Sequence, residues 1–147
     1  MASLLTTERI VESLGGQRVL RHKPKDMEAL KARLRRGLPF AAFLAVARKY
    51  ELSQDEVVKV LALPARTLAR RRVERCLRAD ESDRLFRVSR IAALAEVTLG
   101  SRERAVQWLR RPNRALGNQP PLRQLDTDLG SRQVEEILVR TAHGVYS

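Results

Sequence analysis

The sequence has few aromatic residues, and this scarcity limits how its core can be built. Only 4% of the 147 residues are Phe, Trp or Tyr, although 44% are hydrophobic, and Trp108 is the single tryptophan. The core must therefore come mainly from Leu, Val, Ile and Ala on helix faces. No segment reads as a strand long enough to form a sheet. We therefore expect an all-α protein of one domain or two small ones.

Cysteine and histidine are also scarce, which excludes several kinds of site. The single cysteine, Cys76, excludes an internal disulfide and a cysteine-based zinc site. The only histidines, His22 and His143, lie too far apart in the chain to show metal-ligand spacing. The first residues do not resemble a signal peptide, and no apolar run approaches the length of a membrane span. We expect a cytoplasmic protein that uses no metal, no cofactor and no membrane.

Catalytic motifs are missing too. There is no glycine-rich phosphate loop, no H-E-x-x-H, no nucleophile elbow and no plausible Cys/His pair. Two acidic pairs, Asp80 with Glu81 and Asp126 with Asp128, lie where helix caps and turns are expected. Acid–base catalysis by a carboxylate pair needs converging side chains in a shielded pocket. The sequence therefore predicts that the protein is not an enzyme.

Positive charge is abundant and unevenly distributed. The formal net charge is +12, and residues 1–78 hold 18 Lys/Arg against 8 Asp/Glu, whereas residues 79–147 hold 11 against 9. Such a basic half can bind nucleic acid by neutralising phosphates, which makes binding strongly salt-dependent. A solvated basic surface without a partner is the alternative at this point.

Apolar residues at helical spacing, bounded by capping residues and glycines, predict a string of helices. Thr7 is expected to cap the first helix, which the pair Gly15-Gly16 ends, and Ser131 is expected to cap the last helix, which Gly144 ends. The Pro, Gly and Asn content of residues 110–131 predicts a loop with one helical turn. The expected helical segments are residues 7–14, 26–36, 39–50, 53–61, 64–72, 81–99, 101–109, 121–125 and 131–143.

The segment at residues 53–72 carries the clearest motif. Ser53 and Glu56 form the pattern S-x-x-E, a capping box in which each side chain satisfies a backbone N–H at the start of a helix. This helix ends near Leu61, and Pro64 opens another after a three-residue connection. Two short helices joined by a tight turn are typical of a helix-turn-helix DNA-binding motif.

The second helix of this motif carries the candidate DNA-reading residues. Arg66 and Arg70 are four residues apart and share a face, Thr67 lies beside them, and Leu68 falls on the opposite side. Leu68 can therefore be buried while Arg66, Thr67 and Arg70 face the base edges. Arginine suits this role because it can donate two parallel hydrogen bonds to guanine.

The neighbouring arginines Arg71, Arg72 and Arg75 are expected to hold DNA phosphates, which fixes register without reading sequence. A solvated cationic helix end that offsets the helix dipole is the alternative explanation. An RNA-binding protein is a further alternative, less favoured because stacking aromatics and RNA-module motifs are missing.

The C-terminal half offers two candidate docking surfaces. The loop PNRALGNQPP, residues 112–121, combines apolar Leu116 with rigid prolines and glycine, which suits a shaped protein-binding surface. His143 is favoured as a partner for the last helix carbonyls. Tyr146 can be either a mobile tail residue or an anchor in a partner's pocket. Trp108 is expected to lie in the core.

The same half also carries a specific series of short motifs. They are AVQWL at residues 105–109, RPN at 111–113, ALG at 115–117, PLRQL at 121–125, Gly130 followed by Val134, and AHGVY at 142–146. This series resembles the toxin-binding domain of the Xre-type antitoxins that neutralise RES-domain toxins. The helix-turn-helix segment and ESDRLFRVSRI at residues 81–91 resemble the first half of the same family, so the likeness covers residues 53–146. The turn ALP at residues 62–64 lacks glycine, which is a departure from the family pattern.

The resemblance implies a two-part protein. Residues 1–78 form a DNA-binding region that represses the protein's own operon, with Arg66, Thr67 and Arg70 on bases and Arg71 and Arg72 on the backbone. Residues 79–147 bind and occlude a RES toxin that consumes NAD, and a homodimer is expected on a two-fold operator. The toxin-binding residues are expected to be Pro112, Asn113, Leu116, Gly117, Pro121, His143, Gly144, Val145 and Tyr146. A stand-alone regulator with a C-terminal dimerisation domain is the rival interpretation.

Overall fold

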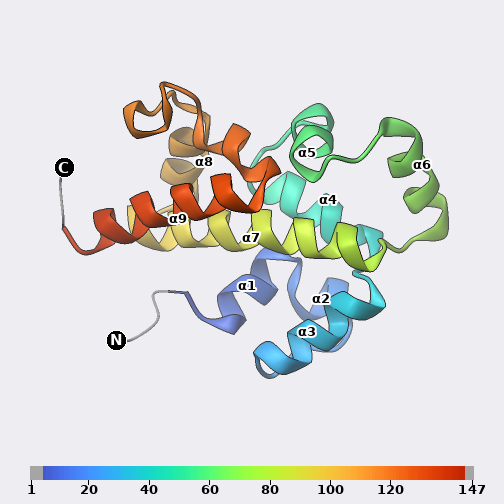
Figure 1. Ribbon diagram of the computed structural model, residues 1–147. Helices are drawn as coiled ribbons and strands as arrows, with labels where there is room; N and C mark the ends of the chain where they lie inside the picture. Colours follow the sequence, from blue (N-terminus) through green and yellow to red (C-terminus); the bar gives the residue numbers. More distant parts are fainter. Residues whose placement is uncertain (1–4, 145–147) are drawn as a thin grey trace.

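A computed structural model describes residues 5–144, and within this range the chain is helical (Figure 1). Its elements are α1 (Thr7–Ser13), α2 (Gly16–Leu20), α3 (Met27–Arg36), α4 (Phe40–Lys49), α5 (Gln54–Leu61), α6 (Ala65–Glu74), α7 (Ala79–Leu99), α8 (Arg102–Arg110), the 3-10 turns η1 (Arg114–Leu116) and η2 (Pro121–Asp126), and α9 (Asp128–Ala142). Backbone pairing of the β kind is limited, in this range, to two isolated bridges, Pro39 with Cys76 and Asn113 with Gln119. The predicted all-α fold is confirmed.

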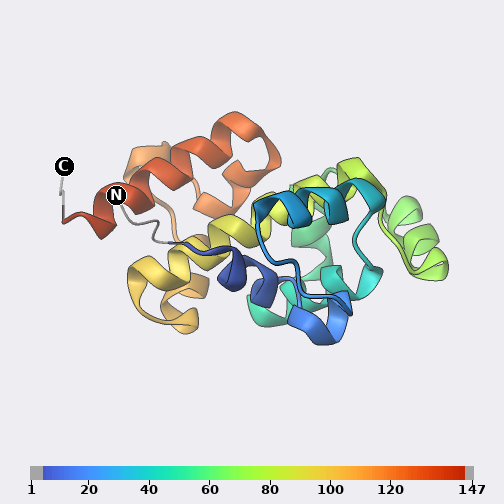
Figure 2. The ribbon, with the colours of Figure 1, turned by 90° about the horizontal axis from the view of Figure 1, so that it is seen from below.

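Helix α7 is the central element of the fold. It packs against α1, α3 and α5 from the N-terminal part and against α8 and α9 from the C-terminal part, and it runs through the middle of the molecule in both views (Figures 1 and 2). Because neighbours surround it, even polar Ser82 and Ser89 on this helix are fully buried. The predicted boundary between residues 78 and 79 falls at the start of α7, and it stays a prediction because this helix contacts both parts.

A buried polar group, the hydroxyl of Tyr50, links the N-terminal helices to this centre. The hydroxyl of Tyr50, at the end of α4, lies 2.8 Å from the Ser13 hydroxyl of α1 and donates to Glu96 of α7 at 3.2 Å. Burial raises the pKa of the Tyr50 hydroxyl. Since Tyr50 is fully buried, these bonds satisfy a polar atom that would otherwise be costly to desolvate.

Two predicted helix starts are wrong, and one helix was not predicted. Thr6 rather than Thr7 caps α1, through a bond from the Arg9 N–H. The last helix is capped by Thr127, whose side chain accepts from the Gly130 N–H at 3.0 Å. Ser131 is instead buried inside α9. The glycine pair at residues 15–16 ends α1 as predicted, but its second member also opens the short helix α2.

Candidate functional site

Helices α5 and α6 form the predicted helix-turn-helix. The capping box is present, since Ser53 Oγ accepts from the Glu56 N–H at 3.1 Å and Glu56 Oε1 accepts from the Ser53 N–H at 2.8 Å. The turn lacks glycine, and Ala62 itself adopts the left-handed conformation that ends α5, with φ at 53°. Pro64 then caps α6. The turn therefore reaches the left-handed conformation that ends α5 without a glycine.

Helix α6 projects from the end of the molecule (Figures 1 and 2). Only Leu68 and Arg71 of its ten residues are buried. Arg66 and Arg70 are exposed, and neither side chain has an ion pair or hydrogen bond within residues 5–144. Thr67 is half-buried beside them. The predicted reading face is thus free to meet a partner, with Leu68 anchoring the opposite side.

Arg71 departs from the role predicted for it. Its side chain is 5% exposed, and its Nε donates to Glu81 at 2.7 Å while its Nη1 donates to Glu74 at 2.9 Å. The hydrogen bond that Arg71 donates to Glu81 is the main reason that the pKa of Arg71 is raised despite burial. Glu81 belongs to the first turn of α7, so this pair fixes α6 to the central helix. A guanidinium held in this way is not free for DNA phosphates, and the prediction for Arg71 is corrected to a positioning role.

Arg72 and Arg75, the other two predicted phosphate ligands, are exposed. The Arg72 guanidinium lies 5.1 Å from the centre of the Phe40 ring, a cation–π arrangement that leaves its hydrogen-bond donors available. Arg75 adopts the left-handed conformation that ends α6, and its carbonyl accepts from the Phe40 N–H at 3.0 Å. The Arg72 side chain and the Arg75 backbone thus both contact Phe40, at the start of α4.

The loop between α8 and η2 is held in shape by hydrogen bonds around Asn113. Its carbonyl accepts from the N–H groups of Leu116 and Asn118, at 3.0 and 2.9 Å, and its side chain accepts from the Ala115 N–H at 3.0 Å. Its own N–H donates to the carbonyl of Gln119 at 3.1 Å. These bonds satisfy much of the loop backbone internally, so the loop presents a defined surface.

The predicted toxin-binding residues of this loop differ in exposure. Pro112 and Gly117 are exposed, whereas Asn113 and Leu116 are half-buried. Pro121 is buried at the first position of η2, so a direct contact with a partner does not fit its position. We correct its predicted role to a structural one.

The end of α9 carries the other predicted contacts. His143 caps the helix and is exposed, and its N–H donates to the Val139 carbonyl at 3.1 Å. Gly144 is exposed with φ at 71°. Val145 and Tyr146 lie outside the described residues. The end of α9 and the 111–120 loop both lie in the part of the molecule away from α6 (Figure 1).

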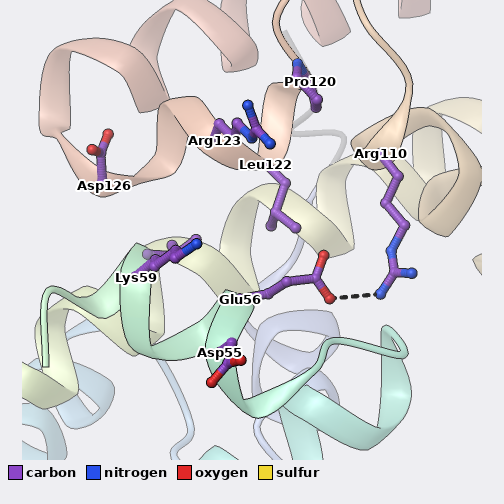
Figure 3. Close-up of a pocket in the computed structure, with 9 residues that line it drawn as sticks. Asp55, Glu56, Lys59, Arg110, Pro120, Leu122, Arg123 and Asp126 are labelled. Carbon is purple, nitrogen blue, oxygen red and sulfur yellow. Dashed lines mark hydrogen bonds and ion pairs between the residues drawn. The ribbon is translucent and has the colours of Figure 1, made fainter. Parts of the chain in front are cut away.

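A groove that sequence reasoning missed lies where α5, α8 and η2 meet (Figure 3). It measures about 520 Å³, and its lining includes Glu56 and Lys59 of α5, Leu122 of η2 and Arg110 of α8. Arg110 bonds to Glu56 at 2.9 Å and to the backbone carbonyl of Glu51, which joins the C-terminal part to the helix-turn-helix. No local motif signals this link, because its partners lie more than fifty residues apart.

The described residues contain no group of His, Cys, Asp and Glu arranged to hold a metal ion. None of the helices in this part of the chain is both long and apolar enough to cross a membrane.

Two families of known proteins match the chain. Residues 29–90 match the antitoxin Xre-like helix-turn-helix domain, and residues 93–144 match the antitoxin Xre/MbcA/ParS C-terminal toxin-binding domain. The two matched regions meet inside α7.

Three curated relatives carry the same description, Antitoxin Xre. The protein from Pseudomonas putida is 43% identical over 84 residues, which cover 56% of this chain and 52% of that protein, so the match spans about half its length. The protein from Photorhabdus laumondii is 30% identical over 120 residues, covering 80% and 81% of the two chains. The protein from Yersinia enterocolitica is 31% identical over 98 residues, covering 65% and 66%.

With matches along both halves, and a relative aligned over most of both chains, the chain belongs to the Xre antitoxin family, a non-enzymatic family of toxin–antitoxin systems, and carries a helix-turn-helix domain followed by a C-terminal toxin-binding domain.

Proposed function

We propose that this antitoxin represses its own operon through α6 and neutralises a RES-domain toxin through its C-terminal surface. The observation that carries the DNA half is the projecting helix α6, whose exposed Arg66 and Arg70 lack any partner in the described chain. Arg66, Thr67 and Arg70 read base edges, while Arg72 and Arg75 hold phosphates. Arg71 contributes by fixing the helix on α7.

Replacement of Arg70 by Ala tests the DNA half. If Arg70 makes a bidentate contact with a base, the variant loses about 1–3 kcal/mol of affinity for the promoter of its own operon. On random duplex DNA the loss of affinity should be smaller. A base contact forms only with the correct sequence, whereas phosphate contacts form with any sequence. Arg114→Ala is the matched control, since Arg114 is exposed in the opposite part of the molecule. Equal losses on both DNAs contradict base reading by Arg70.

A homodimer is part of this proposal. A single short recognition helix contacts few base pairs, whereas two copies related by two-fold symmetry can read half-sites about 34–36 Å apart. Sedimentation of the promoter complex should therefore give two antitoxin chains per palindromic site, and one chain per site contradicts the dimer.

The toxin half rests on the resemblance to antitoxins of RES toxins and on two exposed features. One is the hydrogen-bonded loop of residues 111–120, and the other is the end of α9 at His143 and Gly144. In our proposal these features cover the entrance to the toxin's active site, so that the toxin cannot reach NAD. The C-terminal half is almost neutral, in keeping with a protein partner rather than a polyanion.

Two glycines allow a sharp test of the loop. Gly117 has φ at 64° and open space where a Cβ would lie, and Asn tolerates the left-handed conformation better than most side chains, so Gly117→Asn adds a side chain to the surface. Gly100 has φ at 95° and only one distant neighbour, so Gly100→Asn is the matched control outside the proposed surface. The loop variant should lose inhibition of NAD consumption by the toxin encoded next to this gene, while the control keeps it. Full inhibition by Gly117→Asn contradicts the loop's role.

The rival function is a stand-alone regulator whose C-terminal part serves only for dimerisation. Deleting residues 144–147 separates the two functions, because the shortened chain should still bind promoter DNA but protect cells less well from the neighbouring toxin. Undiminished protection contradicts the role of the tail and leaves the loop as the remaining toxin contact. Absence of any complex with the neighbouring product favours the rival.

A further inference from the structure

Two arginines at the end of α3 form a charged surface that the proposed recognition helix does not include. Arg35 and Arg36, here called the α3 arginine pair, are exposed, and neither side chain has an ion pair or hydrogen bond in the described chain. Arg33 of the same turn differs, because its Nη1 donates to the Gly37 carbonyl at 2.6 Å. The α3 arginine pair is therefore free cationic charge, whereas Arg33 is part of the helix end.

The end of α3 lies directly against the end of α6. The Leu77 N–H donates to the Leu38 carbonyl at 2.8 Å, and the Phe40 N–H donates to the Arg75 carbonyl at 3.0 Å. A Cβ on Gly37 would come within 2.2 Å of the Leu77 carbonyl oxygen. The two segments thus run in close backbone contact, and both ribbon views show the end of α3 beside the junction of α6 and α7 (Figures 1 and 2).

This contact brings the segment that follows the α3 arginine pair next to the arginines at the end of α6. Arg70, Arg72 and Arg75 are all exposed, and the last two contact Phe40, which lies shortly after the α3 arginine pair in the chain. The acidic residue at the end of α6, Glu74, is already paired with Arg71. The exposed arginines therefore keep their full charge for an outside anion.

We propose that the α3 arginine pair holds phosphates of the DNA strand that borders the major groove occupied by α6. This inference rests on the proposed DNA-binding function and extends it to a second helix. The major groove is about 12 Å wide, which a helix with its side chains nearly fills. An inserted α6 is therefore flanked by sugar–phosphate backbone, and the body next to its C-terminal end meets that backbone. Contacts of this kind set the register of the protein on the duplex.

A purely structural role for these arginines makes a different prediction. Cationic side chains in the last turn of a helix offset its dipole, which affects the stability of the fold. Such a role does not change how many counterions are released when DNA binds. The salt dependence of binding therefore distinguishes phosphate contact from helix stabilisation.

The experiment measures promoter affinity against salt concentration for the full chain with Arg35→Ala and Arg36→Ala combined. Two lost phosphate contacts reduce the slope of log K against log salt by about 2, and they weaken binding to promoter and random duplex alike. The control combines Arg111→Ala and Arg114→Ala, which removes the same charge from two exposed arginines of the distant loop. Its slope should match that of the unaltered protein.

Each outcome decides a separate question. A slope for the α3 variant that equals the control slope overturns this inference, even if Arg70→Ala behaves as proposed. If the unaltered protein shows no salt-dependent binding to duplex DNA, the proposed function fails and this inference fails with it. A lowered melting temperature with an unchanged slope assigns the pair to helix stabilisation and also overturns the inference.

Discussion

The ion pair between Arg71 and Glu81 leads to the most quantitative prediction. The two side chains are 5% and 7% exposed, and their Nε to Oε1 distance is 2.7 Å. Glu81→Ala leaves the Arg71 guanidinium buried with only Glu74 as partner, and it also removes the acceptor for the Arg78 N–H. Removal of one member of a buried pair costs about 3–5 kcal/mol, because the remaining charge stays desolvated. This is a large part of the usual stability of a protein, about 5–15 kcal/mol.

Urea unfolding followed by circular dichroism measures this loss. Glu74→Ala is the internal control, since the Glu74 side chain is 48% exposed and its pair with Arg71 should contribute only about 0–1 kcal/mol. Arg71→Met combined with Glu81→Leu removes both charges and should recover most of the stability. The reasoning is refuted if Glu81→Ala unfolds within about 1 kcal/mol of the unaltered protein, or if the apolar double variant is no more stable than Glu81→Ala.

Three further predictions concern packing and pH. Gly130→Ala should lower the urea midpoint although alanine favours helices, because the new Cβ would lie 2.0 Å from the Gln124 carbonyl oxygen; an unchanged midpoint contradicts this packing. Gly37→Ala should also lower the urea midpoint, since φ is 95° there and the new Cβ would clash with the Leu77 carbonyl oxygen. Because this backbone follows α6, the variant should also weaken promoter binding, and unaltered promoter affinity contradicts the link to α6. The hydrogen bonds that Arg90 donates to Glu135 lower the pKa of Glu135 in the folded protein. Their contribution to stability is therefore fully present above the pKa that Glu135 has in the unfolded chain, and it is lost as the pH falls through the pKa that Glu135 has in the folded protein. The difference in unfolding free energy between Glu135→Gln and the unaltered protein should therefore shrink in acid. A difference that does not change with pH contradicts this role of the ion pair.

The helix-turn-helix could be predicted from sequence because its signals are local. The capping box of Ser53 and Glu56 and the proline at position 64 each act within a few residues, and the structure has both helices where these signals place them. Leu68 and Arg70 face opposite ways for the same reason, since helical periodicity alone decides it.

Arg71 shows where such reasoning ends. Residues 66–72 contain four arginines, and their sequence pattern does not reveal which of them is buried. Arg71 is buried because it pairs with Glu81, which lies on another helix. The start of α9 raised a similar difficulty, because Thr127 and Ser131 are both good capping residues. The close approach of Gly130 to the backbone of Gln124 places the helix start earlier, and this contact depends on tertiary packing.

The groove bordered by Arg110 and Glu56 could not be predicted at all, since two elements far apart in the chain create it. Contacts with promoter DNA and with the toxin belong to other molecules, so the exposed residues of α6 and of the 111–120 loop remain proposals that binding measurements must test.

The central claim is that separate surfaces bind DNA and toxin, and one paired binding measurement tests it directly. The affinities of Arg70→Ala and Gly117→Asn are measured for both the promoter duplex and the toxin encoded next to the gene. The account predicts that Arg70→Ala loses promoter affinity by about five-fold or more while toxin binding is unchanged, and that Gly117→Asn shows the reverse. If either variant weakens both interactions to the same extent, the two surfaces are not separate and the account is contradicted.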